Sequence, residues 1–189
     1  MNSVHFKNNV QKNREELVMK TVFIYDSKYG GTKEIVTNIA KLFNHPVTIL
    51  SVEEKNTIQL SNFNQIIFCA PAYAGQLRKD SKVFLEKNQS ALLNKRLFLV
   101  NTGIQFEDSR IQTQIETVFP KELRDHAELT IFAGAVASIN KMNFFERMIL
   151  KKIFKDQQVS FDPKTEYRCL KQEAIDLLLE KANAKMITD

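Results

Sequence analysis

Five short apolar stretches of the chain alternate with segments of helical spacing. The stretches leave no room for a polar stripe, which predicts strands covered on both faces in a parallel sheet. They are residues 21–25, 47–52, 64–70, 96–100 and 129–135. Strands separated by helices predict right-handed βαβ units. We therefore expect an α/β fold with a doubly wound, five-stranded parallel sheet of order 2-1-3-4-5.

The last third of the chain adds a segment that this alternation does not require. Residues 141–155, KMNFFERMILKKIFK, have helical spacing and follow the fifth predicted strand. Their predicted apolar side is formed by Met142, Phe145, Ile149 and Ile153. Five cations and one carboxylate in this segment account for most of the chain's net charge of +5. We expect a basic helical insertion, followed by a last helix over residues 165–184.

Length and composition fit one folded domain. The chain has 189 residues, 43% of them hydrophobic and 26% charged, as in ordinary globular proteins. Residues 19–189 are expected to form a single domain. Residues 1–18 are polar and aperiodic, which predicts a disordered extension, and one hypothesis is that the native protein starts at Met19. The chain has neither an apolar run of the roughly 18 residues that a membrane span needs nor a signal peptide's apolar core, so we expect a cytoplasmic location.

The cysteines and histidines suggest neither a disulfide nor a metal site. Cys69 falls in a predicted buried strand and Cys169 in the predicted last helix. Two cysteines without the spacing of a disulfide framework are expected to be free thiols. The three histidines lack metal-ligand spacing, so no metal site is predicted.

The loop after the first strand has the composition of a phosphate site. It consists of Ser27, Lys28, Tyr29, Gly30, Gly31 and Thr32. The loop opens a predicted helix, whose first backbone N–H groups are unpaired and whose dipole favours an anion. The glycines allow close approach of a ligand, and Ser27 and Thr32 can add hydroxyl donors. The GxxxxGK[ST] and GxGxxG loops are absent. The alternative is an ordinary strand-to-helix turn with a glycine pair.

Two further loops should meet the first one. In an open α/β sheet, ligands bind outside the carboxyl ends of the strands where the strand order reverses, here between the first and third strands. The second loop offers Pro71, Ala72, Tyr73, Ala74 and Gly75, and the third offers Asn101, Thr102 and Gly103. Tyr73 has a flat face for stacking on a ring, or else packs against the neighbouring helix.

These three loops, with GAVASINKMNFFERMILKKIF near the C-terminus, resemble the flavodoxins. The resemblance runs from about Thr21 to about Ala184, and the NFFERMILKKI segment is similar to the branch that includes bacterial quinone-dependent protoporphyrinogen dehydrogenases. The insertion would then lie on the flavin side of the sheet. Two features depart from the family: Tyr29 stands where a small hydroxyl residue is usual, and the chain is basic whereas electron carriers of this type are acidic.

The resemblance implies that the three loops bind FMN. The first loop would bind its phosphate, Tyr73 would stack on the flavin, and the Ala74–Gly75 peptide would contact the ring. The backbone of residues 101–103 would hold the pyrimidine edge, and Phe106 either covers the other face or is an ordinary loop aromatic. A further hypothesis puts the cations Lys28, Arg78 and Lys79 near the flavin, where they would favour its anionic reduced form.

FMN carries the redox chemistry itself, so no catalytic side chain is expected. We expect an FMN-binding flavodoxin-like redox protein that transfers electrons to or from a docked partner or substrate. One alternative is an FMN-dependent enzyme, a quinone-dependent dehydrogenase of protoporphyrinogen or a related tetrapyrrole. Another is a flavodoxin-fold domain that has lost FMN and only binds partners.

The basic segment 141–155 allows two interpretations. One is an amphipathic helix docked on its own domain with its lysines in water. The other is a surface for an acidic partner, an anionic membrane at the inner face of the cell or a tetrapyrrole carboxylate. Nucleic acid is not expected, because the basic residues are not part of a known binding module.

Overall fold

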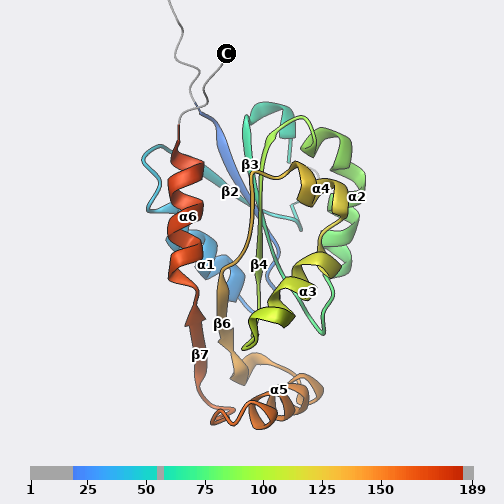
Figure 1. Ribbon diagram of the computed structural model, residues 1–189, viewed down its shortest axis with the longest axis vertical. Coiled ribbons are helices and arrows are strands. Elements are labelled where there is room, and N and C mark those ends of the chain that lie inside the picture. The colour runs from blue at the N-terminus through green and yellow to red at the C-terminus, as the bar shows by residue number, and fades with distance from the viewer. Residues whose placement is uncertain (1–18, 55–57, 185–189) are drawn as a thin grey trace, which may run out of the picture.

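The computed structural model describes residues 19–54 and 58–184 (Figure 1). The predicted disordered extension, residues 1–18, lies outside the described residues. The central sheet has the order β2-β1-β3-β4-β5, and every pair in it is parallel, which confirms the predicted doubly wound α/β fold. Its strands are β1 (Thr21–Tyr25), β2 (Val47–Ser51), β3 (Gln65–Pro71), β4 (Arg96–Thr102) and β5 (Leu129–Phe132).

Helices cover both faces of this sheet. α1 (Gly31–Ala40) and α6 (Gln172–Asn183) pack on one face, and α2 (Lys79–Leu92), α3 (Asp108–Val118) and α4 (Lys121–His126) lie on the other (Figure 1). A short 3-10 turn, η1 (Leu60–Asn62), precedes β3. All side chains of β1 and β3 are buried, because each strand lies between two neighbours and two helical layers. Two apolar cores therefore fill the molecule, one on each side of the sheet.

The fifth strand is shorter than the sequence predicts. β5 ends at Phe132, and the chain turns at Gly134, which has a φ of +88°. A Cβ at Gly134 would lie 2.0 Å from the carbonyl oxygen of Cys169, so only glycine fits this turn. The following residues form a separate strand, β6 (Gly134–Ser138), outside the main sheet.

The last helix also begins later than predicted. Residues 166–170 form a strand, β7 (Glu166–Leu170), which pairs antiparallel with β6. The prediction of a helix from residue 165 was therefore wrong over its first two turns, and Cys169 lies exposed on a strand. Residues 166–170 show no clear alternation of apolar and polar side chains, and the strand they pair with lies about 30 residues upstream. Tertiary contact with β6 thus overrode the local helical spacing.

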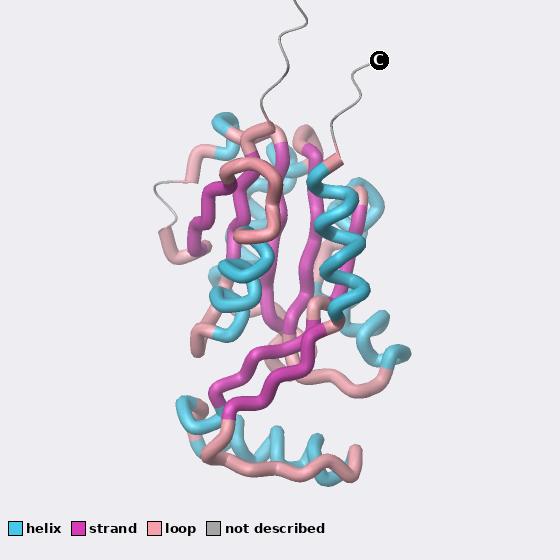
Figure 2. The backbone as a smooth tube through the Cα atoms, turned by 90° about the vertical axis from the view of Figure 1, so that its left-hand side faces the viewer, coloured by secondary structure: helices cyan, strands magenta, loops and turns pink. Residues whose placement is uncertain are grey.

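The basic insertion is the helix α5 (Phe144–Asp156), which follows the 3-10 turn η2 (Ile139–Lys141). It begins with a capping box, in which the Asn143 side chain accepts from the Glu146 N–H and the Glu146 carboxylate accepts from the Asn143 N–H. Figures 1 and 2 show α5 at one end of the molecule, beyond the carboxyl ends of the sheet strands, with the β6–β7 ribbon connecting it to the sheet. We refer to residues 134–170 as the insertion unit.

Aromatic contacts tie the C-terminal part of α5 to its surroundings. Phe154 is buried and packs edge-on against Phe106, Phe161 and Tyr167. Phe145, predicted on the apolar side of the helix, is instead exposed. Within residues 19–54 and 58–184, no helix has the length and apolar character needed to cross a bilayer.

Candidate functional site

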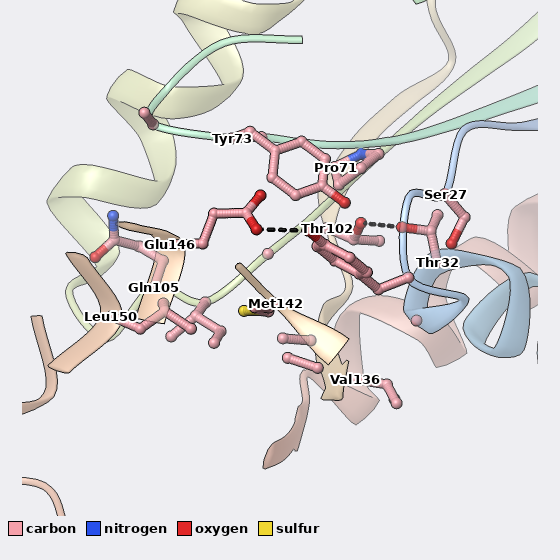
Figure 3. Close-up of a pocket in the computed structure, with 18 of the residues that line it drawn as sticks. Ser27, Thr32, Pro71, Tyr73, Thr102, Gln105, Val136, Met142, Glu146 and Leu150 are labelled. Carbon is pink, nitrogen blue, oxygen red and sulfur yellow. Dashed lines mark hydrogen bonds between the residues drawn. The ribbon is translucent and has the colours of Figure 1, made fainter. Parts of the chain in front are cut away.

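A cavity of about 300 Å³ lies at the carboxyl edge of the sheet, beyond the ends of β1, β3 and β4 (Figure 3). It is lined by the three predicted loops, by β6 and by α5. Most of the predicted site residues line it, namely Ser27, Tyr29, Gly31, Thr32, Pro71, Ala72, Tyr73, Ala74, Gly75, Thr102 and Gly103. The other three, Lys28, Gly30 and Asn101, lie just outside its lining.

The start of the first loop is fixed by a buried carboxylate. Asp26 is fully buried, and its oxygens accept hydrogen bonds from Arg78 at 2.5 Å and from Ser81 at 2.6 Å. Its backbone N–H donates to the Cys69 carbonyl in β3 at 3.0 Å. These contacts hold the end of β1 against the neighbouring loop and leave Ser27 pointing toward the cavity (Figure 3).

The first loop leaves several hydrogen-bond donors without a partner. Gly30 has a φ of +92° and precedes α1, which has no side-chain cap among the described residues. The first N–H groups of α1 are therefore available, since an α-helix leaves its first turn of donors unpaired. The Ser27 hydroxyl is buried and has no hydrogen-bond partner within the described part of the chain. Together these groups form a site suited to an anion.

Gly31 permits close contact between the main fold and the insertion unit. A Cβ at this position would lie 1.8 Å from the backbone oxygen of Val136 in β6. No real side chain tolerates such a distance, so the first turn of α1 and β6 can pack together only around glycine. The sequence suggested a glycine for close approach of a ligand, and the structure shows a close approach of backbone.

Thr32 does not offer a free hydroxyl to the cavity, contrary to expectation. Its Oγ1 lies 2.9 Å from Oγ1 of Thr102, and both side chains are buried. This pair connects the first loop to the third (Figure 3). The hydroxyl therefore positions two loops relative to each other, while the backbone N–H of Thr32 remains in the first turn of α1.

The second loop is a tight turn with strained backbone. Tyr73 and Gln76 exchange both backbone hydrogen bonds, at 2.8 and 3.0 Å, and the two residues between them have positive φ values, +48° at Ala74 and +75° at Gly75. A non-glycine residue in this region costs energy, and such strain clusters at functional sites. Burial raises the pKa of the Tyr73 phenol to about 12, and a hydrogen bond that the phenol oxygen accepts from the Lys28 backbone N–H acts in the opposite direction. Tyr73 therefore lies as a neutral ring across the cavity (Figure 3).

The third loop is held by Asn101 from below the cavity. The Asn101 side chain donates to the Ala70 carbonyl at 3.0 Å and accepts from Gln114 at 2.6 Å, so it joins β3, β4 and α3. Gly103, with a φ of +145°, donates its N–H to the Gly134 carbonyl at 3.0 Å. Phe106 does not line the cavity and belongs to the aromatic cluster around Phe154.

α5 contributes a wall of the cavity, and the wall includes Met142, Ile149 and Ile153 of its predicted apolar side. Its inner face supplies Glu146, Ile149, Leu150 and Ile153, and Met142 precedes it (Figure 3). Other lining residues that were not predicted are Ile35, Ile104, Gln105, Gln114, Ala135, Val136 and Ala137. The position of the insertion after the fifth strand placed it at this edge, and its helical spacing identified part of its apolar side, but neither signal identified Glu146 or Leu150.

Glu146 connects α5 to the first loop. Its carboxylate accepts from Lys28 Nζ at 2.7 Å and from the Tyr29 hydroxyl at 2.5 Å. Desolvation raises the pKa of Glu146, but the hydrogen bonds from Lys28 and Tyr29 outweigh it, so this pKa lies below its usual value. The hydrogen bond to Glu146 in turn raises the pKa of Lys28 to about 12. We call this three-residue contact the Glu146 latch.

The cations that were expected near a flavin do not line the cavity, and two of them form ion pairs with carboxylates. Lys28 is paired with Glu146, and Arg78 is paired with Asp26 and, at 3.5 Å, with Glu53. Neither residue lines the cavity, and neither does Lys79, the first residue of α2. The two paired charges are thus largely neutralised by carboxylates. The anion-binding character of the site comes from backbone donors and the Ser27 hydroxyl.

Comparison with known proteins agrees with this architecture. A family model described as a flavodoxin domain matches residues 22–164. Among solved structures, the chain is similar to the Flv1 flavodiiron core from Synechocystis sp. PCC6803, with 18% identity, a TM-score of 0.41 and coverage of 61% of this chain and 30% of that chain. It is also similar to a Fusobacterium nucleatum flavodoxin bound to flavin mononucleotide, with 22% identity, a TM-score of 0.43 and coverage of 60% and 70%.

A third similar structure is the Trp repressor binding protein from Bacillus subtilis, with 13% identity, a TM-score of 0.48 and coverage of 61% of this chain and 84% of that chain. The chain spans less than a third of the length of the flavodiiron core. The search of curated proteins gives no match.

Proposed function

Because the chain belongs to the flavodoxin domain family, we propose that it binds FMN non-covalently and transfers electrons to or from a docked partner or substrate. The observation that carries this proposal is the orphaned, buried hydroxyl of Ser27 beside the uncapped N-terminus of α1. Buried polar groups are normally hydrogen-bonded, so an unpaired hydroxyl next to free helix donors indicates that a ligand completes the site. A phosphate monoester matches these donors in charge and geometry.

The part of the cavity beyond the phosphate site suits the flavin ring of FMN. Tyr73 supplies a flat, uncharged surface, and Ile149, Leu150 and Ile153 supply an apolar wall on the side of α5. The Ala74–Gly75 peptide lies at the same cavity and can exchange hydrogen bonds with a ring edge. The Gly103 N–H and the Thr102 carbonyl line the cavity edge but are already paired, with the Gly134 carbonyl and the Ala72 N–H. When bound, the flavin would supply the electron transfer, and the loops would bind it, orient it and keep water away.

The strain in the second loop supports a role in presenting hydrogen-bonding groups to the ring. Ala74 holds a φ of +48°, a region that a residue with a Cβ seldom adopts. A flip of the Ala74–Gly75 peptide, which would exchange the directions of its carbonyl and N–H, is one way to relieve this strain. Such a peptide can meet either a bare ring nitrogen or one that carries a proton.

A second candidate function is supported by the wall that α5 adds. Met142 and Ile153 add to the apolar lining on the side of α5, which suits an apolar molecule bound beside the flavin. This favours an FMN-dependent oxidoreductase that acts on an apolar substrate, such as a quinone or a tetrapyrrole. We propose a cytoplasmic location for it. Turnover of protoporphyrinogen with a quinone acceptor would identify such an enzyme, whereas a carrier needs a separate reductase.

Ligand binding tests the proposal directly, with riboflavin as the matched ligand because it lacks the phosphate. The purified protein should bind FMN at least tenfold more tightly than riboflavin, measured by quenching of flavin fluorescence. Ser27→Ala should weaken FMN binding by about tenfold, the equivalent of one hydrogen bond to a charged group, and leave riboflavin binding unchanged. Equal affinity for the two flavins would contradict the phosphate site, and no binding of either would favour a domain that binds only partners.

A further inference from the structure

The outer face of α5 exposes large apolar side chains at one end of the molecule. Phe144, Phe145 and Met148 are 64%, 74% and 55% exposed, although residues of these types are normally buried. They occupy the first turns of the helix and point away from the cavity. Figure 2 shows that α5 lies across the end of the molecule, with the loop that leads to β7 running alongside it.

Basic side chains continue the same face along the helix. Lys151, Lys152 and Lys155 are exposed in the following two turns, and Arg147 lies between the two groups. None of these four cations forms an ion pair with a residue that the structure describes. The outer face therefore combines an unpartnered apolar group with an uncompensated positive charge. We define it by Phe144, Phe145, Met148, Lys151, Lys152 and Lys155.

The helix cannot bury this face by rotating about its axis. Its opposite side is fixed by the buried ring of Phe154 and by the Glu146 latch to Lys28 and Tyr29. Rotation of α5 would remove Phe154 from its aromatic cluster and open the cavity wall. The exposed apolar group is consequently a fixed feature of the fold, and no residue within 19–54 and 58–184 covers it.

We propose that the outer face of α5 docks on the surface of an anionic lipid bilayer. A helix of this length is about 20 Å long and about 10 Å wide, so its face offers roughly 200 Å². A stable protein–protein interface needs about 800 Å² from each partner, which this face alone does not provide. A bilayer sets no such minimum, because the binding strength of an interfacial helix scales with its buried apolar area and its charge.

The arrangement of side chains suits this mode of binding. Phe144, Phe145 and Met148 enter the boundary between headgroups and acyl chains, while the lysines meet the lipid phosphates with their stems along the apolar surface. α5 then lies flat on the membrane, and its inner face still forms the cavity wall. Docking requires no flavin, so this inference stands apart from the proposed redox function.

Vesicle co-sedimentation of the full chain tests the proposal. At low ionic strength, the protein should sediment with vesicles of phosphatidylcholine and phosphatidylglycerol in a 70:30 ratio, and far less with phosphatidylcholine alone. Raising NaCl to 0.5 M should weaken binding by about tenfold, because the lipid charge is screened. Equal binding to neutral vesicles, or none to anionic vesicles at low salt, would overturn the proposal.

Two double variants separate the apolar and basic contributions. Phe144→Ser with Phe145→Ser and, separately, Lys151→Glu with Lys152→Glu should each weaken vesicle binding by about tenfold or more. The matched control is Lys41→Glu with Lys87→Glu, which changes net charge equally at exposed positions away from α5 and should alter binding less than twofold. Circular dichroism checks that each variant is folded. Equal loss in the control, or a dimer that dissociates only in the Phe144/Phe145 variant, would count against a lipid surface.

Discussion

The central sheet and the insertion unit differ in how they bury their side chains. Every residue of β3 is buried, whereas four of the five residues of β7 are exposed. The sheet is covered by helices on both faces, while the β6–β7 ribbon and α5 project from its carboxyl edge (Figure 1). The difference shows that one region forms the stable framework and the other adds a cavity wall and an outer surface. Substitutions should therefore act very differently in the two regions.

The largest effect is expected at Phe68, in the middle of β3. Its ring is fully buried. It stacks on the Phe84 ring, with 5.6 Å between the ring centroids, and packs edge-on against the Phe119 ring, with 6.3 Å between the centroids. Phe68→Ala should lower the free energy of unfolding by about 3–5 kcal/mol, because it leaves a large cavity in a close-packed core. Urea unfolding followed by circular dichroism measures this change. A loss below about 1 kcal/mol would mean that the sheet is not the framework of the fold.

A smaller effect is expected at Gly31, where the two regions meet. Gly31→Ala brings a Cβ against the Val136 backbone, which cannot move without shifting β6. The free energy of unfolding should fall by about 1–3 kcal/mol, the usual cost of overpacking, and FMN binding should weaken as α1 and β6 separate. Gly30→Ala is the control: it is strained by its φ of +92° but has open space around it, so β6 should not move. Hydrogen exchange of residues 134–138 distinguishes the two, and equal exchange in both variants would argue against the close contact.

The Glu146 latch should contribute less, and in a pH-dependent way. Because Lys28 is partly exposed, Glu146→Gln should cost at most about 1 kcal/mol at pH 7. The folded-state pKa of Glu146 is lowered, so its contribution is present above the usual pKa of 4.5 and disappears as the pH falls through the lowered value. The pKa of Lys28 is raised from 10.5 to about 12, so its contribution is present below pH 10.5 and is lost as the pH rises through about 12.

Thermal melting of wild type and Glu146→Gln at several pH values checks the latch. The difference in melting temperature should be largest near neutral pH and should shrink toward both extremes. Glu128→Gln provides a comparison, because Glu128 pairs with Arg96 at 2.6 Å at the opposite end of β4 from the cavity. That variant should leave FMN binding unchanged, whereas Glu146→Gln should loosen the cavity wall. A difference in melting temperature that stays the same at every pH would show that the ionisation of Glu146 and Lys28 does not contribute to stability.

The smallest effect on stability is expected on the outer face of α5. Phe145→Ala makes the same chemical change as Phe68→Ala, but the ring is 74% exposed. The free energy of unfolding should therefore change by no more than about 0.5 kcal/mol. Urea unfolding of Phe145→Ala and Phe68→Ala under the same conditions measures the two losses in the free energy of unfolding. A large loss at Phe145 would show that its ring packs on the chain after all.

Much of the framework could be predicted from the sequence, and the site could be predicted in part. The apolar runs of β1 and β3 are long enough and flanked clearly enough to identify buried strands, and the loop from Ser27 to Thr32 lies where it was expected. The side-chain roles were harder to anticipate. Thr32 turns to Thr102, and Asn101 supports the loop from outside the cavity, because each hydrogen bond depends on a residue far away in sequence.

The amino-acid sequence by itself determined the buried strands, their alternation with helices and the position of the three loops, because these are local patterns of hydrophobicity. The strand order was expected from the rule for doubly wound folds. Only the tertiary structure decided that Glu166–Leu170 is a strand, that Glu146 reaches Lys28 and Tyr29, and that Phe145 faces outward. Each of these depends on a contact between segments that are tens or more than a hundred residues apart. The local sequence pattern does not reveal a pairing of that kind, because the same short segment is compatible with a helix or a strand and its partner in the fold decides between them.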